Sequence, residues 1–135
     1  MNWDELQNYV AKICSRIDFK PEIIVAVARG GVIPGVMIAE KFGIKDMYSV
    51  AVKKQEGKRK IMTKIMDDLH GKKILLVEDA IDTGKSMLAV KKYLESEGAS
   101  VKTAALFIKG STAIMPDYML ETSPDIIFPW GEVQK

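Results

Sequence analysis

One run of residues, Ile74 to Ser86, places a predicted strand, two adjacent carboxylates and a glycine-containing loop directly before a helix. Four apolar residues, Ile74 to Val77, predict the strand, and the apolar spacing after Lys85 predicts the helix. Free N–H groups in the first turn of a helix, together with the helix dipole, bind anions such as phosphate. The run therefore predicts an α/β fold with a phosphate site where this strand leads into the helix.

Two adjacent carboxylates, Glu78 and Asp79, come at the end of the predicted strand, so their side chains should point in different directions. Carboxylates there can accept hydrogen bonds from the hydroxyls of a sugar or hold a hard cation, and the two roles are compatible. In the loop that follows, Thr83 and Ser86 offer hydroxyl donors, and Gly84 allows a close backbone approach. Acids beside a phosphate loop indicate a sugar phosphate as the ligand.

Two simpler interpretations explain less of this run. Residues 84–86 match the end of the phosphate loop of nucleoside triphosphatases, but the first glycine of that loop would fall at Asp79, whose charge repels phosphate. A helix N-cap at Asp82 or Thr83 would explain the loop alone. Neither interpretation explains why two carboxylates precede it.

Strand-like and helix-like segments alternate along the rest of the chain. Apolar spacing and the glycines or prolines that follow it predict helices at 3–17, 33–42 and 85–96, and strands at 23–28, 47–52, 61–66, 74–77 and 101–108. The strands at 47–52 and 61–66 resemble a hairpin with a basic tip at 53–60. Prolines break the tail from Lys109 onward into small strands or loops. The alternation predicts a mostly parallel sheet flanked by helices.

Composition limits the classes of protein. A chain of 135 residues is expected to form a single domain with a real core. Its 20 basic and 18 acidic residues leave a net charge of +2, which gives no general attraction to nucleic acid. No apolar run approaches membrane-spanning length, and the N-terminus does not resemble a secretion signal. We therefore expect a cytoplasmic protein that binds neither nucleic acid nor membranes.

The run from Ile74 to Ser86 resembles the phosphoribosyl pyrophosphate (PRPP) motif of type I phosphoribosyltransferases. In that family the paired acids contact the ribose hydroxyls and the metal, the loop binds the 5′-phosphate, and the later acid lies beside the incoming base. The resemblance implies Mg²⁺ as cofactor, with Asp79 as its ligand, and Asp82 as the catalytic residue. It implies a PRPP site formed by Arg29, Gly30, Glu78, Asp79, Ala80, Ile81, Asp82, Thr83, Gly84, Lys85 and Ser86.

Residues 28–31, Ala-Arg-Gly-Gly, combine unobstructed backbone N–H groups with a guanidinium and therefore suit a diphosphate. They resemble the family's pyrophosphate loop, in which a cis peptide precedes the basic residue, here between Ala28 and Arg29. The basic tip at 53–60 is either a solvated hairpin end or the family's mobile lid over pyrophosphate. Lys58 or Arg59 could supply the closing charge of such a lid.

Lys109 follows the predicted strand 101–108, and in the 6-oxopurine branch of the family a lysine at this place donates to the exocyclic oxygen of the base. The tail resembles the small xanthine-guanine enzymes, which implies that the backbone of Ile126 contacts the base edge. One departure is Asp125, which stands where those enzymes carry an aromatic residue that stacks on the purine. Phe128 or Trp130 could take over, the base could bind less tightly, or the substrate could differ.

The resemblance thus implies a type I phosphoribosyltransferase fold with a small C-terminal hood, and transfer of phosphoribose from PRPP to a 6-oxopurine in purine salvage. Asp82 would face N7 of the purine, and Lys109 would select its 6-oxo group. Homodimers are common in the family, so we expect a homo-oligomer. Two alternatives remain open: a nucleotide-sensing regulator with the same fold, or a transferase for a different base.

Overall fold

A computed structural model describes residues 1–132 of the chain, and it is built around one six-stranded sheet. The strands are β1 (Ile23–Ala28), β2 (Met47–Gln55), β3 (Lys58–Ile61), β4 (Lys73–Ile81), β5 (Ser100–Ile108) and β6 (Glu121–Thr122). Their order across the sheet is β3-β2-β1-β4-β5-β6, and every pair is parallel except the β2–β3 hairpin. The mostly parallel sheet expected from the alternation is confirmed.

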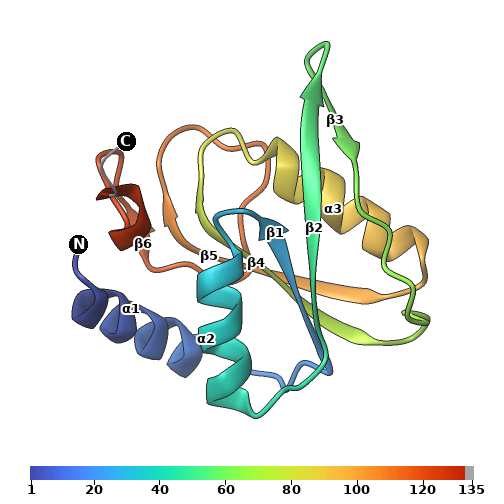
Figure 1. The fold of residues 1–135 in the computed structure, drawn as a ribbon, viewed down its shortest axis with the longest axis horizontal. Helices are drawn as coiled ribbons and strands as arrows, with labels where there is room; N and C mark the ends of the chain where they lie inside the picture. The colour runs from blue at the N-terminus through green and yellow to red at the C-terminus, as the bar shows by residue number, and fades with distance from the viewer. Residues whose placement is uncertain (133–135) are drawn as a thin grey trace.

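Helices cover both faces of the sheet (Figure 1). The helices α1 (Trp3–Arg16) and α2 (Val32–Phe42) pack on one face, and α3 (Lys85–Ser96) packs on the other. A short 3₁₀ helix, η1 (Pro129–Glu132), lies near the start of α1 and forms the C-terminal hood (Figure 1). None of the helices in residues 1–132 has the length and hydropathy needed to cross a membrane.

The apolar half of β4 explains why the sheet needs helices on both sides. Ile74 and Leu76 pack in the core layer that contains α3, while Leu75 and Val77 pack in the layer that contains α1 and α2. All four side chains are at most 1% exposed. Burying such a side chain stabilises the fold by about 1.5–3 kcal/mol. The central strands are therefore a rigid platform for the loops that leave them.

The hairpin differs from the expectation. β2 and β3 continue through the basic residues, and the turn is only Glu56-Gly57, with φ angles of 52° and 77°. Two-residue turns with two positive φ angles match the natural twist of paired strands, so pairing starts directly beside the turn. The second strand ends at Ile61, and the prediction that it runs from 61 to 66 is wrong. The tip projects beyond the sheet (Figure 1), and β3 lies beside α3.

β4 is also longer than expected. Its backbone pairs with β5 as far as Ile81, which lies opposite Ile108. Glu78 and Asp79 therefore lie within the last residues of a paired strand rather than after its end. This pairing fixes the directions of both carboxylates.

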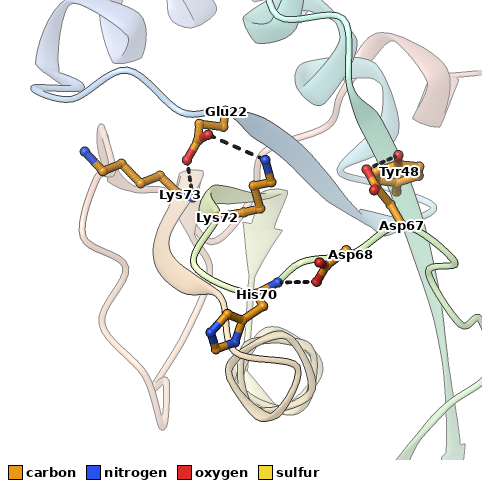
Figure 2. A network of polar contacts seen from close by, with 7 residues as sticks. All are labelled: Glu22, Tyr48, Asp67, Asp68, His70, Lys72 and Lys73. Carbon is orange, nitrogen blue, oxygen red and sulfur yellow. Dashed lines mark hydrogen bonds and ion pairs between the residues drawn. The ribbon is translucent and has the colours of Figure 1, made fainter.

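The edge of the sheet opposite the phosphate loop is held by ordinary polar contacts (Figure 2). Glu22 accepts a hydrogen bond of 3.0 Å from the backbone N–H of Lys73 and lies 4.0 Å from the ammonium of Lys72. Tyr48 donates to Asp67 at 2.8 Å. The contacts of Glu22 tie the beginnings of β1 and β4 together, and the Tyr48 contact ties β2 to the segment before β4. The exposed ion pair adds little to stability.

Candidate active site

Three loops meet at one edge of the sheet because they leave the carboxyl ends of neighbouring parallel strands. Arg29 follows β1, Asp82 follows β4, and Lys109 follows β5. From β1 the chain moves to β2 on one side, while β4 lies on the other side. The connections thus reverse between β1 and β4, where open α/β sheets bind their ligands.

The loop after β4 surrounds a hollow of about 230 Å³. Gly84, with φ of 77°, is the N-cap of α3, and no side chain caps this helix. The interpretation of Asp82 or Thr83 as the N-cap is therefore wrong, although the Thr83 hydroxyl accepts a long hydrogen bond of 3.4 Å from the N–H of Lys85. An uncapped helix start beside a hollow suits an anion. The lining residues are Arg59, Glu78, Ala80, Ile81, Asp82, Thr83, Gly84, Lys85 and Ser86.

The two carboxylates diverge, as their adjacency in a strand predicts. Glu78 lines this hollow, whereas the carboxylate of Asp79 lies against Gly30 in the loop after β1. Burial, reinforced by the nearby charge of Asp79, raises the pKa of Glu78 to about 8. Burial also raises the pKa of Asp79, and backbone N–H groups and the charge of Lys109 oppose that shift. Both acids are held where a cation or sugar hydroxyls would compensate their desolvation.

The loop after β1 approaches β4 very closely. The expected cis peptide between Ala28 and Arg29 is present. A Cβ atom on Gly30 would lie 2.4 Å from Oδ1 of Asp79, and one on Gly31 would lie 2.2 Å from the carbonyl oxygen of Val77. Backbone atoms exclude any side chain at position 31, whereas a Cβ atom at position 30 would displace the carboxylate of Asp79. Gly31 was not among the predicted site residues, although the double glycine signalled a tight loop.

Arg59 is the main site residue that the sequence placed imprecisely. Its Nε donates to Oγ of Ser86 at 3.3 Å, and its Nη1 is buried without a hydrogen-bond partner. The guanidinium therefore lies on the loop after β4, although the resemblance implied a closing charge over pyrophosphate. Alternation along β3 puts Arg59 inward and leaves Lys58 and Lys60 exposed. No pattern in the sequence indicated which loop the inward residue would reach.

The two predicted base-binding residues, Lys109 and Ile126, lie in different parts of the fold. Lys109 is exposed at the end of β5, and its charge acts on Asp79. Ile126 is partly buried and packs against the core layer of α1 and α2. Asp82 lies beside Gly110, the first residue after Lys109. Ile126 is thus anchored at the hood, and Lys109 lies beside the loop that carries Asp82.

Phe128 is too buried to replace the missing stacking residue at Asp125, whereas Trp130 lines a hollow with Arg29 and Gly30 and stays a candidate. Phe128 is only 6% exposed and packs against Phe107 with a centroid distance of 6.0 Å. Trp130 stacks on Phe128 at 4.8 Å with an interplanar angle of 1°, and it also contacts Trp3. These rings form a continuous packed group, so neither Phe128 nor one face of Trp130 is available to a ligand. Asp125 itself is exposed.

The donor set suits a magnesium ion that is shared with a substrate. In residues 1–132 no group of three or more His, Cys, Asp or Glu side chains converges on one point. Mg²⁺ rarely uses an all-protein cage and is commonly held by one or two carboxylates together with substrate phosphates. Oε2 of Glu78 is buried without a hydrogen-bond partner, and Asp79 borders the loop after β1. The residues present therefore fit this mode of binding.

Comparisons with known proteins agree with this geometry. A family model described as the phosphoribosyl transferase domain matches residues 2–134. A xanthine-guanine phosphoribosyltransferase of Chromohalobacter salexigens is 31% identical, and the match covers 96% of this chain and 82% of the relative.

Solved structures give the same result. The purine phosphoribosyltransferase of Pyrococcus horikoshii Ot3 superposes with a TM-score of 0.90 at 32% identity, over 100% of this chain and 95% of that one. The xanthine-guanine-hypoxanthine phosphoribosyltransferase of Helicobacter pylori has the same fold, with a TM-score of 0.83 at 24% identity over 97% and 91% of the two chains. The expected type I phosphoribosyltransferase fold is confirmed. The chain therefore belongs to the phosphoribosyl transferase domain family.

Proposed function

We propose that this protein transfers the 5-phosphoribosyl group from PRPP to a 6-oxopurine base, releasing pyrophosphate and the purine nucleotide in purine salvage. The observation that carries the proposal is the shared edge at which the phosphate hollow, the paired acids and the diphosphate loop meet. The relatives named xanthine-guanine and purine phosphoribosyltransferase support a purine as the acceptor.

The 5′-phosphate would bind in the hollow at the start of α3. The proposed donors are the backbone N–H groups and hydroxyls from Thr83 to Ser86, with Lys85 at the rim. The buried Nη1 of Arg59 has no partner and lines the same hollow, so a phosphate oxygen would satisfy it. Charge-assisted hydrogen bonds of this kind are about twice as strong as neutral ones. We therefore add Arg59 to the PRPP-binding residues.

The ribose and the diphosphate would lie between β4 and the loop after β1. Glu78 would accept hydrogen bonds from ribose hydroxyls, and Arg29 with the N–H of Gly30 would hold the diphosphate. Ala80 and Ile81 line the hollow and would exclude water from the ribose. Mg²⁺, held by Asp79 and the substrate oxygens, would supply positive charge against the departing pyrophosphate.

The base would approach from the side of Asp82. Departure of pyrophosphate would leave positive charge on the anomeric carbon, and the lone pair of purine N9 would form the new C–N bond to that carbon while the proton leaves N7. Asp82 would accept or hold the proton at N7, Lys109 would donate to the 6-oxo group, and the backbone of Ile126 would contact the base edge. The exposed side chain of Asp125 would not stack on the base, so a stacking partner would have to come from another residue such as Trp130.

One assay tests the proposal directly. The purified protein is mixed with PRPP, Mg²⁺ and each of hypoxanthine, guanine, xanthine, adenine and uracil, and nucleotide formation is followed. Turnover with a 6-oxopurine is expected, and Asp82→Asn should lower kcat about 100-fold or more, within the range of general acid–base catalysis. Asp125→Asn is the matched control and should leave kcat close to wild type. Product with adenine or uracil alone would identify a different acceptor, and binding of nucleotide without turnover would identify a regulator.

We further propose that the chain acts as one domain, in the cytoplasm, as a homo-oligomer. Membership of the family and the exposure of Val36 on α2, 46% of its surface, support a contact between copies. Light scattering of the purified protein measures the mass, and Val36→Glu should shift it toward the monomer. A monomeric mass for the wild type would contradict this assembly.

A further inference from the structure

The segment 110–114 runs along the outside of the phosphate loop and contacts consecutive residues of it. A Cβ atom on Gly110 would lie 2.6 Å from Oδ1 of Asp82, so the backbone there lies directly against that carboxylate. The N–H of Ala113 donates to the carbonyl oxygen of Thr83 at 2.7 Å. Two residues of the phosphate loop are thus held from outside by a segment that follows another strand.

The side chain of Thr112 sets the shape of this segment. Its hydroxyl lies 2.7 Å from the carbonyl oxygen of Ile114 and accepts a hydrogen bond of 3.2 Å from the N–H of the same residue. The hydroxyl is also 3.4 Å from the carbonyl oxygen of Thr83. A Cβ atom on Gly84 would lie 2.3 Å from Thr112 Oγ1. Thr112 therefore closes the turn that presents Ala113 and packs directly on the loop.

The contact to the Thr83 carbonyl fixes the direction of a phosphate donor. In a planar trans peptide the C=O and the N–H point in opposite directions. The carbonyl of Thr83 points outward to Ala113, so the N–H of Gly84, in the same peptide, points the other way. Both Thr83 and Gly84 line the phosphate hollow. Because Gly84 has a positive φ and no Cβ, this peptide would rotate easily if its carbonyl were released.

We propose that Thr112 is a positioning residue for PRPP: through the turn 112–114 it holds the Thr83–Gly84 peptide in the orientation that directs the Gly84 N–H at the 5′-phosphate. The proposal rests on the proposed function for the identity of the phosphate ligand. It also joins the two substrate sites, because the segment that begins at Lys109 braces the loop that binds the phosphate. Thr112 itself is not a catalytic residue.

The test compares three variants of the whole chain. Thr112→Val removes the hydroxyl and keeps the shape of the side chain, Thr112→Ser keeps the hydroxyl, and Ser111→Ala changes an exposed neighbour. PRPP binding with Mg²⁺ is measured by calorimetry without a base, and KM for PRPP, KM for the base and kcat are measured where turnover occurs. Thermal midpoints report the fold.

Thr112→Val is expected to weaken PRPP binding about tenfold, the loss of one hydrogen bond to a charged group, with KM for PRPP rising in parallel. Its KM for the base and its thermal midpoint should stay near wild type, and Thr112→Ser and Ser111→Ala should both bind PRPP like wild type. Equal PRPP affinity for Thr112→Val and wild type overturns the proposal. The proposal is also overturned if Thr112→Val and Thr112→Ser are impaired equally in PRPP affinity, both KM values, kcat and thermal midpoint, because a general loss of structure would then explain the data.

Failure of the proposed function has a different signature. If wild type binds PRPP but converts no 6-oxopurine, the acceptor assignment fails, while the calorimetric comparison still decides the role of Thr112. If wild type binds no PRPP, both the proposed function and this inference fall.

Discussion

Gly30 lies against the carboxylate of Asp79 so closely that a Cβ atom at position 30 would stand 2.4 Å from Oδ1 and 2.5 Å from Cγ. The two residues belong to different strand ends, so each limits the position of the other. Gly30→Ala should push the carboxylate out of place. Because Asp79 is the proposed Mg²⁺ ligand, we expect kcat/KM for PRPP to fall about 10–100-fold, the range seen when the partners of a metal ligand are changed.

The measurement is a steady-state titration of PRPP at several Mg²⁺ concentrations, with Gly131→Ala as control. A Cβ atom on Gly131 would make only an ordinary contact, at 3.4 Å from Ile127. An unchanged kcat/KM for PRPP in Gly30→Ala would contradict the prediction, because displacing the Asp79 carboxylate would then not affect the reaction.

Glu78 predicts a pH dependence of stability. Its pKa is raised from 4.5 to about 8 in the folded protein by burial and by the nearby Asp79, so the folded state binds this proton more tightly than the unfolded state. The protonated carboxyl therefore favours folding below about pH 4.5, and that contribution is lost as the pH rises through about 8. In the absence of Mg²⁺ and PRPP, Glu78→Gln should be more stable than wild type at pH 8.5, by about 1–3 kcal/mol, because no buried charge forms.

Thermal unfolding from pH 5 to pH 9 checks this expectation. The difference between the midpoints of wild type and Glu78→Gln should grow with pH. A constant difference across the range would mean that the carboxyl titrates normally in the folded protein.

Arg59 predicts a defect in substrate binding. Within residues 1–132, Arg59→Ala removes the partly buried guanidinium whose Nη1 is buried beside the hollow at the start of α3. KM for PRPP should rise about 10–100-fold, which corresponds to a lost charge-assisted hydrogen bond of about 1.5–3 kcal/mol. Lys60→Ala removes an exposed charge from the next position of β3 and should have little effect. Similar KM values for both variants would assign the effect to the general charge of the hairpin.

Replacing Asp125 with an aromatic residue is expected to improve binding of the base. Asp125→Trp would restore an aromatic face beside Ile126, and aromatic stacking contributes about 0.5–1.5 kcal/mol beyond burial. KM for the base should fall about 2–10-fold with KM for PRPP unchanged. Initial rates over a range of hypoxanthine and guanine concentrations measure this, with Asp125→Asn as the variant that removes only the charge. A higher KM for the base in Asp125→Trp would place the purine elsewhere.

Sequence patterns predicted the elements that carry a regular pattern of apolar residues. The bounds of β1 and α3 agree with the prediction, because an uninterrupted apolar run and a helical apolar spacing each have one favourable environment in a layered α/β fold. The cis peptide before Arg29 followed from the family resemblance and is present. Local chemistry and a known motif were sufficient for these features.

The same reasoning failed where a tertiary contact decides. β3 is a basic segment with no apolar alternation, and it is a strand because the Glu56-Gly57 turn pairs it with β2. The contact of Ala113 with Thr83 joins positions 30 residues apart across two loops, and neither loop has a repeating pattern. The hydrogen bond from Arg59 to Ser86 likewise depends on how the hairpin lies over α3.

Because the turn at Glu56-Gly57 has only two residues, the length of the hairpin determines which side chains of β3 face inward. Side chains along β3 alternate between two faces, and Arg59 reaches the phosphate loop because it falls on the inner one. Inserting or deleting one residue between the turn and Arg59 would reverse this parity and turn the guanidinium to solvent, while a pair of inserted residues would keep it inward but move it along the strand. Substitutions at the exposed residues of the tip are therefore tolerable, whereas a single-residue change of its length would put a neighbouring lysine in the place of Arg59, the proposed phosphate ligand.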